Sequence, residues 1–226
     1  MTTRALVFDR DGVLTHFDFA PLMALFEGVP KASFEALWRA WQAHTRLAPP
    51  PRRASAESGY VAAFWRTVRE AWELDDALEA RLNRFDYTTA IRAFDDARPT
   101  LERARERGLR IAVLSNFPFV GLQASLRAAG LLDLVDVTFA AGVAGAPKPD
   151  PSAYLHTLDR LDVAPAECAL VDDEEECVDG ARRVGIRAYR LDRRAKEATP
   201  ESIPDLRRFL EVALEPAAAG ARASPG

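Results

Sequence analysis

The feature that most constrains the fold of this chain is the alternation of short apolar runs with amphipathic helical segments after Arg98. Short apolar runs that end abruptly in turn residues are typical of buried strands. Connections long enough to hold a helix place successive strands parallel to one another, with the helices covering the sheet. One further apolar run, residues 4–8, lies at the start of the chain. The sequence therefore predicts an α/β fold built on a parallel sheet.

The same pattern gives approximate bounds for these elements. The strands are expected at residues 4–8, 109–114, 135–140, 168–171 and 186–191. The helices are expected at about 99–108, 118–129, from 151 onward, up to 185, and around 206–214. Asp150 should cap the helix that begins at Pro151.

A helical insertion separates the first strand from the other four. Between about Phe17 and Phe94 the apolar residues recur at helical spacing, and all four tryptophans of the chain lie there. The proline-rich segment 48–55 cannot continue a helix and is expected to be an exposed connection. Because the insertion leaves and rejoins the chain beside the loop after the first strand, we expect it above the carboxyl ends of the strands, where open α/β sheets hold their ligands.

We predict the following domain bounds from these patterns. The α/β core comprises residues 1–15 and 95–215, the helical insertion comprises residues 16–94, and residues 216–226 form a frayed tail.

Composition narrows the range of partners. The chain has 30 basic and 34 acidic residues, a formal net charge of −4, so no global positive field attracts nucleic acid. No apolar run reaches the roughly 18–20 residues that span a bilayer, and no long apolar region precedes a cleavage site, so we expect a cytoplasmic protein without a membrane partner. It is expected to be a monomer or homodimer. Cys168 and Cys177 are too few for a disulfide framework and are expected to be reduced and buried.

Asp9 and Asp11 come directly after the first apolar run, and Gly12 allows the backbone to turn sharply behind them. An Asp-x-Asp pair alone is a weak signal, because a chain this acidic contains one by chance. The alternative is an ordinary turn with two solvated acids. The position directly behind a buried strand favours a functional pair.

Asp172 and Asp173 follow a later apolar run in the same way, and three glutamates come after them. The favourable interaction of acids with a helix N-terminus explains the glutamates. It does not explain the aspartates, because a buried strand that ends in two carboxylates is electrostatically costly unless a cation lies among them. Hard oxygen ligands of this kind suit Mg²⁺.

Further polar residues could complete such a site. Ser115 and Asn116 follow an apolar strand, where hydroxyl and backbone N–H groups can hold an anionic oxygen, although the pair is also ordinary turn chemistry. Lys148 lies between two prolines that stiffen its backbone, whereas most lysines are merely exposed. If the strands are parallel, these residues share one edge of the sheet with the aspartates. Several acids and one lysine then predict a divalent metal, and the remaining donors predict a cradle for a phosphoryl group.

Together these residues resemble the motifs of the haloacid dehalogenase-like (HAD) hydrolase superfamily. The four motifs occur in order as Phe8–Leu14, Leu114–Asn116, Lys148–Pro151 and Val171–Asp173. The helical insertion between the first two is similar to the C1 cap of subfamily I. The resemblance implies a Rossmann-like parallel sheet core with an inserted α-helical cap domain, and a phosphatase type of activity.

The resemblance also implies catalytic roles. Asp9 would be the nucleophile that forms an aspartyl-phosphate and a ligand of Mg²⁺. Asp11 would protonate the leaving alkoxide, activate a water, and ligate the metal through its backbone carbonyl. Lys148 would neutralise nucleophile and phosphate.

The remaining motif residues would hold the metal and the phosphate. Asp173 aligns with the direct metal ligand and Asp172 with a second acid that acts through water. Ser115 and the backbone of Asn116 align with the phosphate-binding group.

Outside the motif roles, Arg10 and His16 are candidates for substrate binding. Arg10 fills a motif position that is usually apolar in similar cap-bearing proteins, and it could form a salt bridge to either aspartate or point away from the site. His16 lies in the linker just beyond the first motif. Weaker cap candidates, each more simply structural or solvent-facing, are Phe17, Phe19, His44, Arg46, Arg52, Arg53 and Tyr60.

The resemblance therefore predicts a Mg²⁺-dependent phosphomonoester hydrolase that acts on a small phosphorylated metabolite, such as a sugar phosphate. Similar dehalogenases lack an acid at the position of Asp11, because a halide leaves without a proton, so a phosphatase is favoured. Phosphonatases use a cap lysine, and Lys31 is the only one in this insertion. The alternatives are a non-catalytic phosphate-binding or regulatory protein and a sugar phosphomutase.

Overall fold

The fold is described from a computed structural model that describes residues 2–48, 51, 53–117, 121–199 and 202–215. The first half of the chain contains β1 (Ala5–Phe8), β2 (Thr15–Phe17), α1 (Ala20–Met23), α2 (Phe34–Leu47), α3 (Ala54–Trp72), α4 (Asp76–Asn83), β3 (Ile91–Ala93) and α5 (Ala97–Glu106). The second half contains β4 (Arg110–Ser115), α6 (Leu122–Ala128), β5 (Val137–Ala140), α7 (Ala141–Ala144), α8 (Pro151–Leu161), β6 (Cys168–Asp172), α9 (Glu175–Arg183), β7 (Arg187–Leu191), β8 (Ser202–Ile203) and α10 (Leu206–Leu214).

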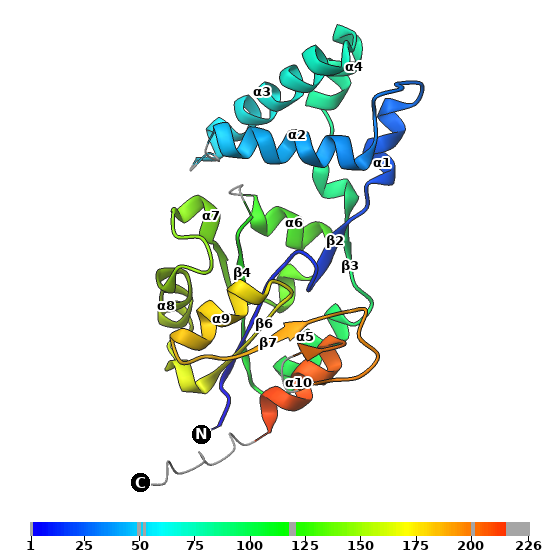
Figure 1. Cartoon of the computed structure of the whole chain (residues 1–226). Helices are drawn as coiled ribbons and strands as arrows, with labels where there is room; N and C mark the ends of the chain where they lie inside the picture. Colours follow the sequence, from blue (N-terminus) through cyan, green and yellow to red (C-terminus); the bar gives the residue numbers. More distant parts are fainter. Residues whose placement is uncertain (1, 49–50, 52, 118–120, 200–201, 216–226) are drawn as a thin grey trace, which may run out of the picture.

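A six-stranded sheet in the order β5-β4-β1-β6-β7-β8 forms the centre of the core (Figure 1). All of its strand pairs are parallel. Phe8 at the end of β1 pairs with Val113 of β4 and with Val171 of β6. The residues that follow these three positions therefore leave the sheet at the same edge, and the predicted α/β fold with a parallel sheet is confirmed.

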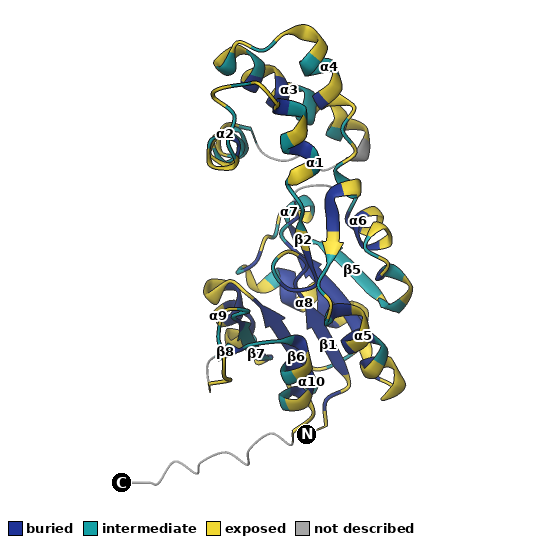
Figure 2. Cartoon of the chain, turned by 90° about the vertical axis from the view of Figure 1, so that its right-hand side faces the viewer, coloured by how far each residue is buried: buried dark blue, intermediate teal, exposed yellow. Residues whose placement is uncertain are grey.

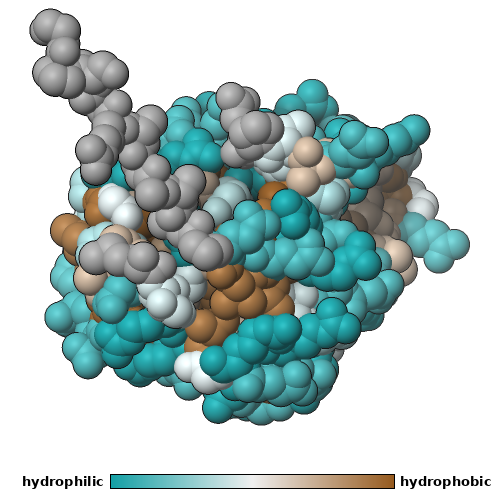
Figure 3. Space-filling view, turned by 90° about the horizontal axis from the view of Figure 1, so that it is seen from below, coloured by the Kyte–Doolittle hydropathy of each residue, from teal (hydrophilic) through white to brown (hydrophobic). Residues whose placement is uncertain are grey.

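Alternation of side chains along β1 divides the core into two apolar layers. Leu6 and Phe8 face the layer that contains α5, α6 and α10, whereas Ala5 and Val7 face the layer that contains α8 and α9. The strands of the sheet are accordingly buried in Figure 2, and exposed residues lie on the outer sides of the helices. Seen from the amino ends of the strands, the surface is mostly hydrophilic around an apolar area (Figure 3).

The helices α1 to α4 form the inserted cap, which stands over the carboxyl ends of the strands (Figure 1). It has its own apolar cluster, in which Phe26, Phe64 and Trp65 are buried. Ser33 caps α2 through a hydrogen bond from Ala36 N at 3.1 Å. Most apolar side chains of the cap thus pack within the cap or face the core beneath it.

The two chain segments that join cap and core pair with each other as the antiparallel hairpin β2–β3. Arg193, which follows β7, anchors this junction: its guanidinium donates to Val13 O at 2.6 Å, pairs with Asp96 at 3.0 Å and stacks on Phe94 at 3.8 Å. The cap is therefore tied to the core beside the loop that follows β1.

Several expectations from the sequence need correction. The hairpin β2–β3 lies within the stretch expected to be helical, and its strands are too far apart in sequence for a local signal. The expected five-stranded sheet has a sixth strand, β8, which is only two residues long. Helix α5 begins at Ala97, so Pro99 lies in its first turn rather than opening it.

Other expectations are confirmed or stay predictions. Asp150 caps α8, whose first residue is Pro151, and both cysteines are free and buried. Residues 118–120 and the expected tail 216–226 lie outside the described residues. The domain bounds 1–15, 16–94 and 95–215 stay predictions. Within the described part of the chain, every helix is too short or too polar to cross a membrane.

We expect Phe209→Ala to lower the free energy of unfolding by about 3–5 kcal/mol. Phe209 is fully buried, and its ring centroid lies 5.3 Å from that of Phe8 in an edge-on contact. Leu47→Ala is the control and should change stability by less than about 0.5 kcal/mol, because Leu47 is 88% exposed. Urea unfolding of both variants measures the difference, and a loss near that of the control at Phe209 would contradict this packing.

Candidate active site

Asp9 is held at the end of β1 by the neighbouring strand. Its amide donates to Val171 O of β6 at 3.0 Å, which continues the ladder one residue beyond Phe8. On β6, Val171 is followed by Asp172. The parallel register thus brings two carboxylates from distant parts of the sequence to one level, as the sequence predicts.

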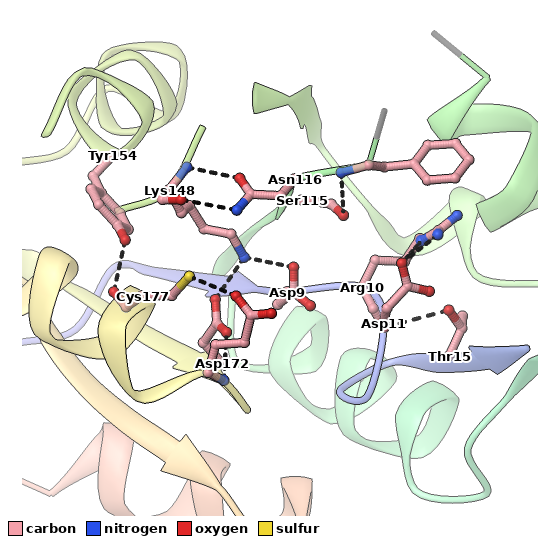
Figure 4. A network of polar contacts seen from close by, with 12 residues as sticks. Asp9, Arg10, Asp11, Thr15, Ser115, Asn116, Lys148, Tyr154, Asp172 and Cys177 are labelled. Carbon is pink, nitrogen blue, oxygen red and sulfur yellow. Dashed lines mark hydrogen bonds and ion pairs between the residues drawn. The ribbon is translucent and has the colours of Figure 1, made fainter. Parts of the chain in front are cut away.

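Lys148 lies between these two carboxylates. Its Nζ donates to Asp9 Oδ1 and to Asp172 Oδ2, each at 2.6 Å, and all three side chains are at least nine-tenths buried (Figure 4). Burial lowers the pKa of Lys148, but the charges and hydrogen bonds of the two aspartates outweigh it and raise that pKa above its usual value. The lysine is therefore a fixed ammonium ion.

Asn116 holds the backbone of the lysine in place. Its Oδ1 accepts from Lys148 N at 2.7 Å, and its Nδ2 donates to Lys148 O at 3.0 Å (Figure 4). The Asn116 side chain is thus committed to the lysine loop, whereas Ser115 Oγ accepts from the amide of Phe117 at 3.2 Å. The structure brings all three predicted residues to the aspartates.

Three carboxylates could hold a divalent cation. Asp9, Asp172 and Asp173 each offer an oxygen within 4.8 Å of the others. Both oxygens of Asp172 already have partners, since Lys148 donates to one and Glu174 N donates to the other at 3.0 Å. Desolvation and the charge on Asp9 raise the pKa of Asp172, and they raise the pKa of Asp173 to about 6. Crowded carboxylates of this kind favour a cation among them.

Gly12 gives Asp173 the space it occupies. Its φ of +74° is in the left-handed region, and a Cβ on this residue would collide with the Asp173 carboxylate. The sharp turn expected behind the Asp-x-Asp pair therefore also lets the fourth motif approach the first.

Arg10 resolves an alternative that the sequence left open. Its guanidinium is buried and pairs with Asp11 Oδ2 at 2.5 Å, while Nη1 donates to Ser125 Oγ at 2.9 Å. It also stacks on the ring of Phe117 at 3.8 Å. Arg10 thus points to Asp11, not away from the site, and its Coulomb interaction is with the proposed acid.

Asp11 differs from the other carboxylates in its exposure. Its side chain is 52% exposed, in contrast to 10% for Asp9. Desolvation raises the pKa of Asp11 above its usual value, against the opposing effect of Arg10. Its carboxylate is held by Arg10 yet open to a ligand, which suits a group that exchanges protons.

Other predicted residues lie away from this cluster. His16 is exposed on β2, where its ring packs against Phe94 with centroids 5.0 Å apart. Lys31 pairs with Glu73 at 3.6 Å within the cap. Of the weaker cap candidates, Phe17 and Phe19 line a pocket beneath the cap, and Arg52 lies outside the described residues.

Several supporting residues were missed by the sequence analysis. Tyr154 OH donates to Cys177 O at 2.7 Å and so joins α8 to α9 (Figure 4). Gly180 lets α9 approach, because a Cβ there would lie 2.7 Å from Tyr154 OH and 2.8 Å from Pro149. Ser125 and Phe117 hold Arg10. Only Tyr154 carried a signal, because a polar hydroxyl on an apolar helix face needs a buried partner.

Comparisons with known proteins agree with this geometry. Residues 3–185 match the family model described as haloacid dehalogenase-like hydrolase. The chain is 37% identical over 197 residues to Phosphatase MT3486 of Mycobacterium tuberculosis, which covers 85% of this chain and 89% of that protein. It is 32% identical over 198 residues to the phosphoserine phosphatase of Thermus thermophilus, with 84% and 76% covered. A crystal structure of a dehalogenase with an intermediate complex superposes with a TM-score of 0.71 at 26% identity, with 95% and 99% covered.

Gly12→Ala is expected to weaken binding of a divalent cation about tenfold or more, because the new Cβ displaces the Asp173 carboxylate. Gly108→Ala is the matched control: its φ is +73°, so it shares the backbone strain, but nothing lies within 4 Å of the added Cβ. Calorimetric titration of both folded variants with Mg²⁺ measures the difference. Equal affinities would show that Asp173 does not hold the ion.

Proposed function

Because the chain belongs to the haloacid dehalogenase-like hydrolase family, we propose that it is a Mg²⁺-dependent phosphomonoester hydrolase. It acts on a small phosphorylated metabolite through an aspartyl-phosphate intermediate. The observation that carries the proposal is the pairing of Asp9, buried and fixed by Lys148, with Asp11, a half-exposed carboxylate two residues later. A phosphate ester needs both a nucleophile and a proton donor for its leaving group.

The described residues fit a magnesium ion. The carboxylates of Asp9, Asp172 and Asp173 cluster at one edge of the sheet, and hard oxygen donors are the ligands that this ion prefers. Asp9 and Asp173 would hold it directly, with the backbone carbonyl of Asp11. Asp172, whose oxygens have protein partners, would act through water. When bound, Mg²⁺ offsets negative charge on the nucleophile and the phosphoryl group.

The reaction has two steps. In the first, an oxygen of Asp9 forms a bond to phosphorus while the bond from phosphorus to the leaving oxygen breaks, and Asp11 gives that oxygen its proton. In the second, Asp11 takes a proton from water as the water attacks phosphorus, and the bond between phosphorus and Asp9 breaks. Inorganic phosphate leaves and Asp9 is restored. The same residue serves as acid and then as base.

The other residues position the phosphoryl group. Lys148 keeps its positive charge beside Asp9, so it neutralises nucleophile and phosphate together. Ser115 and the backbone N–H groups after β4 donate hydrogen bonds to phosphoryl oxygens. Arg10 orients Asp11, and His16 remains a candidate for contact with the rest of the substrate.

A dehalogenase is the second candidate, because the dehalogenase structure superposes over nearly the whole chain. Asp11 favours the phosphatase, since halide leaves without a proton. The phosphomutase and the non-catalytic binder differ in their products: a mutase releases no inorganic phosphate, and a binder is silent with every ester.

Asp9→Asn is expected to lower Mg²⁺-dependent hydrolysis of p-nitrophenyl phosphate by about 10⁴-fold or more, because the amide is a poor nucleophile. Acid quench of the parent and mass spectrometry should find phosphate on the peptide that contains Asp9. Asp133→Asn is the control and should retain activity within about twofold, since its ion pair with Arg98 is exposed. Near-parental turnover by Asp9→Asn would refute the proposed nucleophile.

Asp11→Asn is expected to slow hydrolysis of an alkyl ester, such as 2-phenylethyl phosphate, by about 10²–10⁴-fold. The first step with p-nitrophenyl phosphate should suffer less, because nitrophenolate leaves without a proton, and the second step should still be slow. Stopped-flow measurements should therefore show a burst of nitrophenolate. Equal losses for both esters without a burst would contradict the assigned role.

A further inference from the structure

A pocket of about 400 Å³ lies beneath the cap. Most of its lining residues are aromatic. Trp38 and Trp41 come from α2 and Trp65 comes from α3, whereas Tyr87 and Phe117 belong to segments next to the core. Its volume is in the usual range for sites that bind small molecules, about 300–1,000 Å³.

Phe117 connects this pocket to the candidate active site. Its ring lines the pocket and carries the Arg10 guanidinium at 3.8 Å, and the same guanidinium pairs with Asp11 at 2.5 Å. The amide of Phe117 donates to Ser115 Oγ at 3.2 Å. One ring and one guanidinium therefore separate the pocket from the carboxylate that serves the leaving group.

The chemistry of the lining restricts what can enter. Among the described residues that line the pocket, Glu57 is the only charged one, and no cation is present to hold a second anionic group. A hydroxyl group buried without a hydrogen-bond partner costs about 1–3 kcal/mol. An aromatic ring instead gains about 0.5–1.5 kcal/mol from each favourable contact with another ring, beyond the burial of its surface.

We propose that this pocket binds the leaving group of the substrate, and that the substrate is a phosphomonoester of an aromatic or similarly bulky apolar alcohol. The inference rests on the proposed function, because it places the ester oxygen at Asp11 and the apolar group beyond Phe117. It departs from the sugar phosphate that the sequence favours, since a sugar would bring its hydroxyl groups against aromatic rings.

Two esters of primary alcohols test the substrate class, because their leaving groups differ little in chemical reactivity. The value of kcat/KM for 2-(1-naphthyl)ethyl phosphate should exceed that for glucose 6-phosphate by about 100-fold. The free alcohol, 2-(1-naphthyl)ethanol, tests the pocket without catalysis. It should change the fluorescence of the protein on binding, because three of the four tryptophans line the pocket.

Two half-exposed aromatic residues on α2 provide matched variants. Trp38 lines the pocket and is 47% exposed, whereas Phe34, one turn earlier, does not line it and is 42% exposed. Trp38→Ala should weaken binding of the alcohol at least about fivefold and lower kcat/KM for the naphthyl ester about tenfold. Phe34→Ala should leave both within about twofold, and thermal melts confirm that both variants are folded.

Each outcome separates the inference from the proposed function. Turnover of both esters with equal kcat/KM, or equal effects of the two variants, would overturn the apolar pocket as the leaving-group site and leave the phosphatase intact. Binding of the alcohol that Trp38→Ala weakens, without turnover of any ester, would refute the phosphatase and with it the assignment of this pocket to a leaving group. Turnover with the expected preference and the expected loss at Trp38 supports both.

Discussion

The site depends on one electrostatic constraint: carboxylates are buried at the end of a sheet against a single ammonium ion. Lys148 contacts Asp9 and Asp172 at 2.6 Å, and loss of one partner from a buried ion pair typically costs about 3–5 kcal/mol. The surrounding structure therefore holds the lysine tightly. Asn116 binds its backbone from both sides, and Tyr154 fixes the helix that begins behind it to α9.

The core and the cap divide the chemistry between them. The core holds the charges, because parallel strands end at one edge and their polar loops converge there. The cap holds aromatic side chains, which form both its own apolar cluster and the lining of the pocket. Arg10 connects the two regions, since its guanidinium contacts Asp11 by charge and Phe117 by its flat face. A ligand that spans both regions needs a phosphoryl group at one end and an apolar group at the other.

Arg10 illustrates what sequence reasoning left open. Strand alternation points a residue between two inward-facing acids away from the site, and charge draws it towards them. In the structure the backbone has already left the strand at Arg10, so alternation no longer applies. The hydroxyl of Ser125 and the ring of Phe117 then decide its position. Both come from β4 and α6 or the segment between them, over a hundred residues away, and no local pattern connects them to the first motif.

The sequence by itself determined the parallel sheet, the helical insertion and the residues at the strand ends, because periodicity and turn chemistry are local properties of the chain. The contact of Gly12 with Asp173, the hairpin that joins cap to core and the aromatic pocket were decided only by tertiary structure. Each depends on how closely segments distant in sequence approach one another, and that distance is set by packing, not by the residues of any one segment.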